Sequence, residues 1–136
     1  MTALSQDRNT PERSGDTREP GVAANVILFA GAMAAINASG FAVPVTAATN
    51  LKGAGRVEKR VTNTGGAAGA QRVKIRAGIF RYGNSTAADA ITLADIGSDA
   101  YGVDDQTVAK TSATNTRSVV GKIFDVDDQG VWVKFS

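Results

Sequence analysis

The chain ends in the stretch that decides its fold, SVVGKIFDVDDQGVWVKFS at residues 118–136. Apolar side chains recur at alternate positions on each side of a short acidic turn, and these are Val120, Phe124, Val126, Val131, Val133 and Phe135. Such alternation is typical of half-buried strands, and Gly130 supplies the left-handed backbone conformation that the turn at residues 127–130 needs. Trp132, the only tryptophan, lies in the middle of the second strand. We therefore predict a hairpin that closes a sheet and is not itself a functional site.

The composition limits both the size of the core and the chemistry. With 136 residues the chain is long enough for one domain, and its 15 glycines and few aromatic residues predict a thin core of Val, Ile and Ala. A thin core favours association with further subunits. The sequence contains no Cys and no His, which removes disulfides, thiolate chemistry, the commonest general base and the usual catalytic triads. A net charge of +2 is small for a nucleic-acid-binding protein but leaves that class open.

Residues 1–20 differ in character from the rest of the chain. They alternate basic and acidic side chains, contain Pro11 and Pro20, and have almost no apolar residues. Such a segment buries too little surface to offset its ordering entropy, so we expect an extended arm outside the core of a β-rich domain at residues 21–136. A basic start and an apolar run, as in a secretory signal, are missing. The arm is either a loose end or a segment that becomes ordered on a partner.

Residues 21–51 carry no charge, but they do not resemble a membrane span. Polar residues and Pro44 interrupt the stretch, and Ala and Gly outnumber Leu and Ile. Three short strands, at residues 26–29, 33–36 and 41–45, fit it better. The second and third are joined by an Asn37-Ala38-Ser39-Gly40 turn.

Two further strands have a basic outer face. Between residues 56 and 61, Arg56, Glu58 and Arg60 share one face of a strand, opposite Val57 and Val61. A similar alternation follows a Gly-rich loop, between residues 72 and 82. The predicted inward residues of the second strand are Val73, Ile75, Ala77 and Ile79. The predicted outward basic residues of this long hairpin are Arg56, Arg60, Arg72, Lys74 and Arg76. Gly78 could mark a bulge that turns Phe80 or Tyr82 into the core. The basic face either keeps the sheet soluble or docks an acidic protein surface or phosphates.

The remaining segments complete an all-β fold. Thr92 and Asp95 have the spacing of a capping box around one helical turn. Strands follow at residues 100–103 and 107–109, and a polar loop at residues 110–117 leads to the final hairpin. Many short strands with Gly-rich turns predict a small single-domain β-sandwich or barrel of antiparallel strands with an extended N-terminal arm.

No arrangement of residues indicates catalysis. The pair Gly121-Lys122 is followed by Ile123, so it does not form a phosphate-binding loop. Asp125, Asp127 and the residues after them imitate the start of a calcium loop, but Ser136 occupies the twelfth position and strands flank the turn. A turn capped by Asp side chains is the better interpretation. We predict that the protein is not an enzyme and needs no cofactor or metal.

A series of motifs resembles the small decoration, or cement, proteins encoded beside the major capsid protein in tailed bacteriophages and Mu-like prophages. In chain order the matching stretches are residues 22–25, 41–44, 62–70, 76–82, 94–97, 103–108 and 127–133. Each stretch alone is only a strand-and-turn signature, and the specificity lies in their order. Residues 1–20 fall outside the resemblance.

The resemblance implies a structural virion protein. Such proteins bind the outer surface of the major capsid protein shell, commonly as trimers, and tie neighbouring subunits together. This chain would accordingly be made in the host cytoplasm and act on the virion, with no small-molecule substrate and no membrane. The candidate partner-binding residues are Arg8, Arg13, Arg18, Arg56, Arg60, Arg72, Lys74 and Arg76. The alternative is a small basic β-barrel that binds nucleic acid. Against it, aromatic side chains, on which bases would stack, fall largely outside the basic face.

Overall fold

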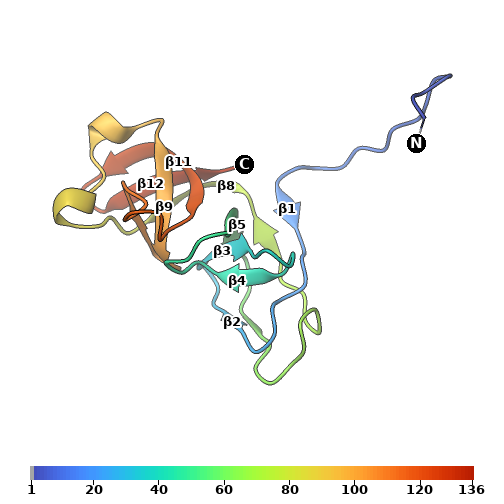
Figure 1. The fold of residues 1–136 in the computed structure, drawn as a ribbon, viewed down its shortest axis with the longest axis horizontal. Coiled ribbons are helices and arrows are strands. Elements are labelled where there is room, and N and C mark those ends of the chain that lie inside the picture. Colours follow the sequence, from blue (N-terminus) through green and yellow to red (C-terminus); the bar gives the residue numbers. More distant parts are fainter. Residues whose placement is uncertain (1) are drawn as a thin grey trace.

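The computed structural model describes residues 2–136, which contain twelve strands and two single-turn 3-10 helices (Figure 1). The first sheet contains, in spatial order, β1 (Thr17–Arg18), β7 (Ile75–Arg76), β5 (Lys52–Val57), β3 (Met33–Ile36) and β4 (Ala42–Pro44). The second contains β10 (Thr107–Ala109), β9 (Asp99–Asp104), β11 (Val119–Asp127), β12 (Gly130–Phe135) and β8 (Gly78–Tyr82). The third pairs β2 (Ile27–Leu28) with β6 (Val61–Thr62). All strand pairs within these sheets are antiparallel, which confirms the predicted all-β class.

The C-terminal hairpin forms as predicted, with one error. Strand β12 lies between β11 and β8, and its residues Val131, Val133 and Phe135 are buried. Two register shifts, between Val119 and Gly121 and between Ile123 and Asp125, interrupt the alternation of β11. Because of these shifts, Ile123 is buried and Phe124 is 53% exposed, so the expected inward position of Phe124 is wrong.

Strand β3 explains the charge-free stretch. Met33 and Ala35 belong to a core shared with the second sheet, whereas Ala34 belongs to a core on the opposite face. A strand buried on both faces cannot carry charged residues and reads as a continuous apolar run. The three predicted strands at residues 26–29, 33–36 and 41–45 correspond to β2, β3 and β4.

The segment at residues 72–82 divides between two sheets. Gly78 has a φ of +155°, and the chain passes there from β7 in the first sheet to β8 in the second. Phe80 and Tyr82 turn toward the core, as the Gly78 bulge predicted, while Ile79 is 37% exposed and not inward as expected. The long basic hairpin is also wrong, because β5 and β7 pair over only two positions.

The two large sheets approach one another closely where β5 passes β11. A Cβ atom built on Gly53 of β5 would overlap the backbone carbonyl of Val120 in β11. Only a residue without a side chain allows this contact. Gly53 therefore fixes how closely the two sheets pack.

The single-turn helices lie in the connection between β8 and β9. η1 spans Ala87–Asp89 and η2 spans Leu93–Asp95. The predicted capping box is present, since the Thr92 backbone N–H donates to the Asp95 carboxylate over 2.8 Å. No helix among residues 2–136 is long and apolar enough to span a membrane.

The N-terminal segment has two parts. Figure 1 shows residues 2–15 running away from the sheets, whereas Thr17–Arg18 pair with β7 as strand β1. The backbone N–H of Ala77 donates to the Asp16 carbonyl over 2.7 Å, and that of Val73 to the Pro20 carbonyl over 3.1 Å. The segment that leaves the sheets is therefore shorter than the predicted residues 1–20, and Met1 lies outside the described residues.

Candidate protein-binding surface

The eight predicted partner-binding residues do not form one patch. Arg8 and Arg13 are exposed on the outgoing segment, and Arg60 lies in the turn between β5 and β6. Arg56 and Arg76 are cross-strand partners in the first sheet, so their side chains share one face. The other three lie near the edge of this sheet that β1 forms. They are Arg18 in β1, Arg72, and Lys74 just before β7.

Acidic groups balance part of this charge. Arg56 forms an ion pair with Glu58 over 3.0 Å. The pKa of Asp16 is lowered, chiefly by a hydrogen bond from the Ser14 hydroxyl and in part by the positive charges of Arg76 and Lys74. The basic face is thus a mixed-charge surface with an excess of guanidinium groups.

A shallow groove of about 470 Å³ runs beside Arg56 and along β8. It is lined by Gly31, Arg56, Ile79, Phe80, Arg81, Tyr82 and Trp132. The Arg56 guanidinium lies 4.3 Å from the centre of the Phe80 ring, and that of Arg81 lies 5.6 Å from the Trp132 ring. Both distances are within the range of cation–π attraction, so the rings position the two positive charges.

Two of the groove residues, Arg81 and Trp132, were missed by the sequence reasoning. They are directly opposite each other in β8 and β12 and therefore share a face of the second sheet. Phe80 is an exception to the prediction that aromatic side chains fall largely outside the basic face, because it lies beneath Arg56. The alternation within β8 is the sequence signal that could have indicated which side chains of this strand share a face. It gives the correct faces only if the parity is reversed at Gly78.

Tyr82 and Asp127 form hydrogen bonds with residues that line the groove. The Tyr82 hydroxyl donates to the Gly31 carbonyl over 3.0 Å, and burial raises its pKa, so it remains a protonated donor. The Trp132 indole N–H donates to Asp127 over 2.8 Å. That hydrogen bond, together with the backbone N–H of Gln129, lowers the pKa of Asp127. Asp127 Oδ1 accepts hydrogen bonds from the backbone N–H groups of Gln129 and Gly130 in the turn, in agreement with an Asp-capped turn, while Oδ2 accepts from Trp132.

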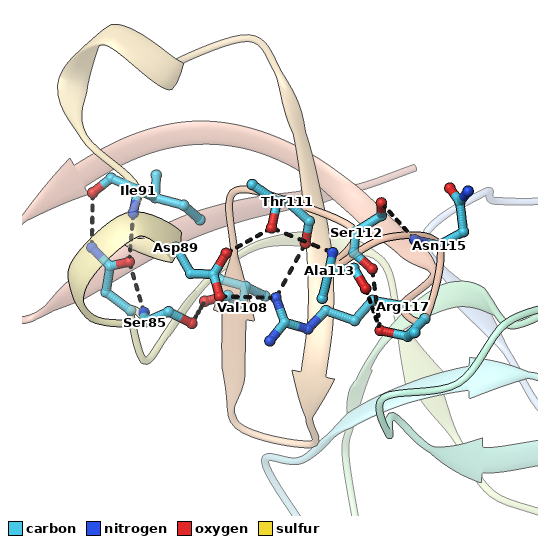
Figure 2. Close-up of polar contacts among 11 residues, drawn as sticks. Ser85, Asp89, Ile91, Val108, Thr111, Ser112, Ala113, Asn115 and Arg117 are labelled. Carbon is cyan, nitrogen blue, oxygen red and sulfur yellow. Dashed lines mark hydrogen bonds and ion pairs between the residues drawn. The ribbon is translucent and has the colours of Figure 1, made fainter.

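A second polar cluster joins two loops (Figure 2). Asp89 accepts a hydrogen bond of 2.6 Å from the Thr111 hydroxyl and an ion pair of 3.4 Å from Arg117. The Thr111 hydrogen bond is the main reason why the pKa of Asp89 is lowered, and Arg117 adds to it. Ser85 donates to the Val108 carbonyl, so its hydroxyl also ties the η1 loop to β10. These contacts close loops and do not form a nucleophile–base pair.

The described part of the chain contains no cluster of three or more metal-ligating side chains, and none of its buried side-chain polar atoms lacks a hydrogen-bond partner. The chain matches no protein-family model, no curated protein and no solved structure. A functional hypothesis must therefore rest on the features of the chain itself. These are an antiparallel β body, an outgoing N-terminal segment and a groove lined by guanidinium and aromatic groups.

Proposed function

We propose that the protein is a capsid decoration protein of a tailed bacteriophage or Mu-like prophage. It binds the outer surface of the major capsid protein shell as a trimer and has no catalytic activity. The observation that carries this proposal is the extended segment at residues 2–15, which projects from a β body whose motif series resembles that family (Figure 1).

The physical requirements of such a role match the features of this chain. A decoration protein needs a rigid scaffold and extensions that reach adjacent subunits. A polar segment that becomes ordered only on docking loses conformational entropy at that moment, yet it can cross a subunit boundary. When each trimer engages several sites, modest interfaces combine into firm attachment.

Exposed apolar side chains support the oligomer. Phe29, Leu93, Ile96 and Phe124 are all exposed on the single chain. Large apolar side chains on a surface are covered when they lie in a subunit interface. Light scattering at micromolar concentration is expected to give a trimer, and a stable monomer would contradict this part of the proposal.

The attachment itself is tested by co-sedimentation with empty heads assembled from the major capsid protein of the same genome. The full chain is expected to sediment with the heads at a fixed stoichiometry. A variant lacking residues 2–15 should bind more weakly, with some binding retained by the β body. Unchanged occupancy of the truncated chain would show that the segment is not an attachment arm.

The second candidate function is nucleic-acid binding, favoured by the Arg56–Phe80 and Arg81–Trp132 pairs. Against it, a guanidinium already lies over each ring, which leaves less of the aromatic surface for stacking with bases. Binding of a single-stranded oligonucleotide across salt concentrations separates the candidates, because phosphate contacts weaken steeply with salt. Tight, salt-dependent binding together with no attachment to heads would favour the second candidate.

A further inference from the structure

The sheet edges of this fold are protected unequally. The outer edge of β4 is covered by Val22, which bridges to Ala42. That of β10 is covered by Gly83, which accepts a hydrogen bond from the Val108 backbone N–H and donates one to the Gln106 carbonyl. Strand β1 covers the outer side of β7 and is only two residues long. Proteins commonly cover or shorten their edge strands in these ways because an open edge pairs with other chains.

Among the edge strands of the two five-stranded sheets, β8 is the exception. It is five residues long, and its only strand partner is β12 on one side. Within residues 2–136, no other backbone hydrogen bond involves Ile79, Phe80 or Arg81. Every second residue of an edge strand points its N–H and C=O away from the sheet, so β8 offers backbone donors and acceptors to an incoming strand.

The groove described above runs along this open edge. Residues of β8 form one side of it, Gly31 and Arg56 from the region of the first sheet form another, and Trp132 adjoins Arg81. Arg81 has no ion-pair partner within 4.0 Å among the described residues. The edge therefore combines unused backbone hydrogen-bonding groups with two guanidinium groups that the Phe80 and Trp132 rings hold in place.

We propose that an extended, acidic peptide segment of a partner protein adds to β8 as a further strand and places carboxylates on Arg81 and Arg56. Guanidinium groups bind carboxylates through paired, charge-assisted hydrogen bonds, and the exposed Ile79, which shares one face of β8 with Arg81, provides an apolar contact beside it. The identification of that partner as the capsid protein rests on the proposed function, but the site itself does not. A second copy of β8 is a poor occupant, because pairing two such edges brings like charges together.

Binding is tested with the full chain and a capped hexapeptide, Thr-Val-Asp-Glu-Val-Thr, whose adjacent carboxylates point to opposite faces of a strand. Trp132 is the only tryptophan and lines the groove, so its fluorescence reports occupancy. Backbone amide shifts of residues 78–82 locate the peptide by NMR. We expect both signals to respond to the peptide, with an affinity that falls as salt is raised.

Matched controls separate charge from backbone pairing. Arg81→Gln should weaken binding about tenfold, as expected for loss of a charge-assisted hydrogen bond, whereas Lys110→Gln, which removes an exposed positive charge outside the groove, should leave it unchanged. The same peptide methylated on its backbone nitrogens keeps its carboxylates but cannot donate to a strand, and it should not bind.

Three results would overturn the proposal. These are an equal response to the peptide with two lysines in place of the acidic residues, amide shifts confined to other strands, and a stronger response to oligothymidylate than to the acidic peptide. If the peptide fails to bind while the full chain still attaches to heads, the groove assignment is wrong and the decoration function stands. If the peptide binds and the chain does not attach to heads, the groove assignment stands and the decoration function is wrong.

Discussion

Two deletions at the N-terminus distinguish the free segment from the strand that follows it. Removing residues 2–15 leaves β1 in place, whereas removing residues 2–20 also removes Thr17–Arg18 from the edge of the first sheet. If residues 1–20 were an arm entirely outside the core, as the sequence alone predicts, neither deletion would change the stability. The structure predicts instead that the two deletions differ.

The size of the difference follows from the hydrogen bonds that β1 and its flanks make. The longer deletion removes the acceptors for the Ala77 and Val73 backbone N–H groups and the β1–β7 ladder. A typical intramolecular hydrogen bond contributes about 0.5–1.5 kcal/mol net, so the longer deletion should reduce the free energy of unfolding by about 2–4 kcal/mol. The shorter deletion should change it by less than about 0.5 kcal/mol, because it removes only exposed residues.

Thermal and urea unfolding monitored by circular dichroism measures both variants at one protein concentration, which is necessary if the chain is oligomeric. A loss of about 2–4 kcal/mol corresponds to a decrease in Tm on the order of 10 °C for a chain of this size. Equal Tm values for the two deletions would refute the reasoning, since they would show that β1 contributes nothing to the stability of the sheet.

Three further predictions concern the body of the fold. Gly53→Ala should destabilise by at least about 3 kcal/mol in urea unfolding, because the added Cβ meets the Val120 carbonyl and the sheets must separate. Trp132→Ala should cost about 1–2 kcal/mol, below the 3–5 kcal/mol of a core aromatic, because the indole is half-buried on the outer face of β12. The pKa of Asp127 is lowered in the folded protein from its ordinary value of 3.8, so its contribution to stability is present above pH 3.8 and is lost as the pH falls through the lowered pKa. Trp132→Phe removes the main cause of that shift and should make stability less sensitive to acid in this window.

Each of these has a control and a result that would contradict it. Gly15→Ala, where an added Cβ meets no atom within 4 Å, should leave stability unchanged, and an equally harmless Gly53→Ala would refute the close approach of the sheets. A Trp132→Ala loss of 3–5 kcal/mol, with a fully buried emission spectrum in the wild type, would place the indole in the core. Identical acid denaturation of Trp132→Phe and the wild type would show that the Asp127 hydrogen bond is not maintained in solution.

Much of the fold follows from local patterns. The C-terminal hairpin, the capped turn at Thr92 and the three strands of the charge-free stretch are specified by period-two alternation, turn residues and capping spacing, all of which act within a few residues. The position of Phe124 was wrong because β11 contains two register shifts, one on each side of Ile123, so that Ile123 replaces Phe124 at the inward position while Val126 still packs against the core. No residue in this stretch signals these shifts to a reader of the sequence as Gly78 signals the bulge before β8.

The groove could not be predicted, because its residues are distant in the chain. Gly31, Arg56, the strand β8 and Trp132 meet only after β8 leaves the first sheet and pairs with β12. Its register with β12, which places Arg81 beside Trp132, depends on tertiary packing. The same holds for β1, because the polar composition of residues 1–20 gives no sign that two of them pair with β7.

The most direct test of the proposed function is a cryo-electron microscopy reconstruction of heads, assembled from the major capsid protein of the same genome and incubated with the full chain. The account predicts additional density on the outer surface, as trimers at three-fold or quasi-three-fold positions, with residues 2–15 ordered across a subunit boundary. Heads that remain undecorated at saturating protein concentration would contradict it.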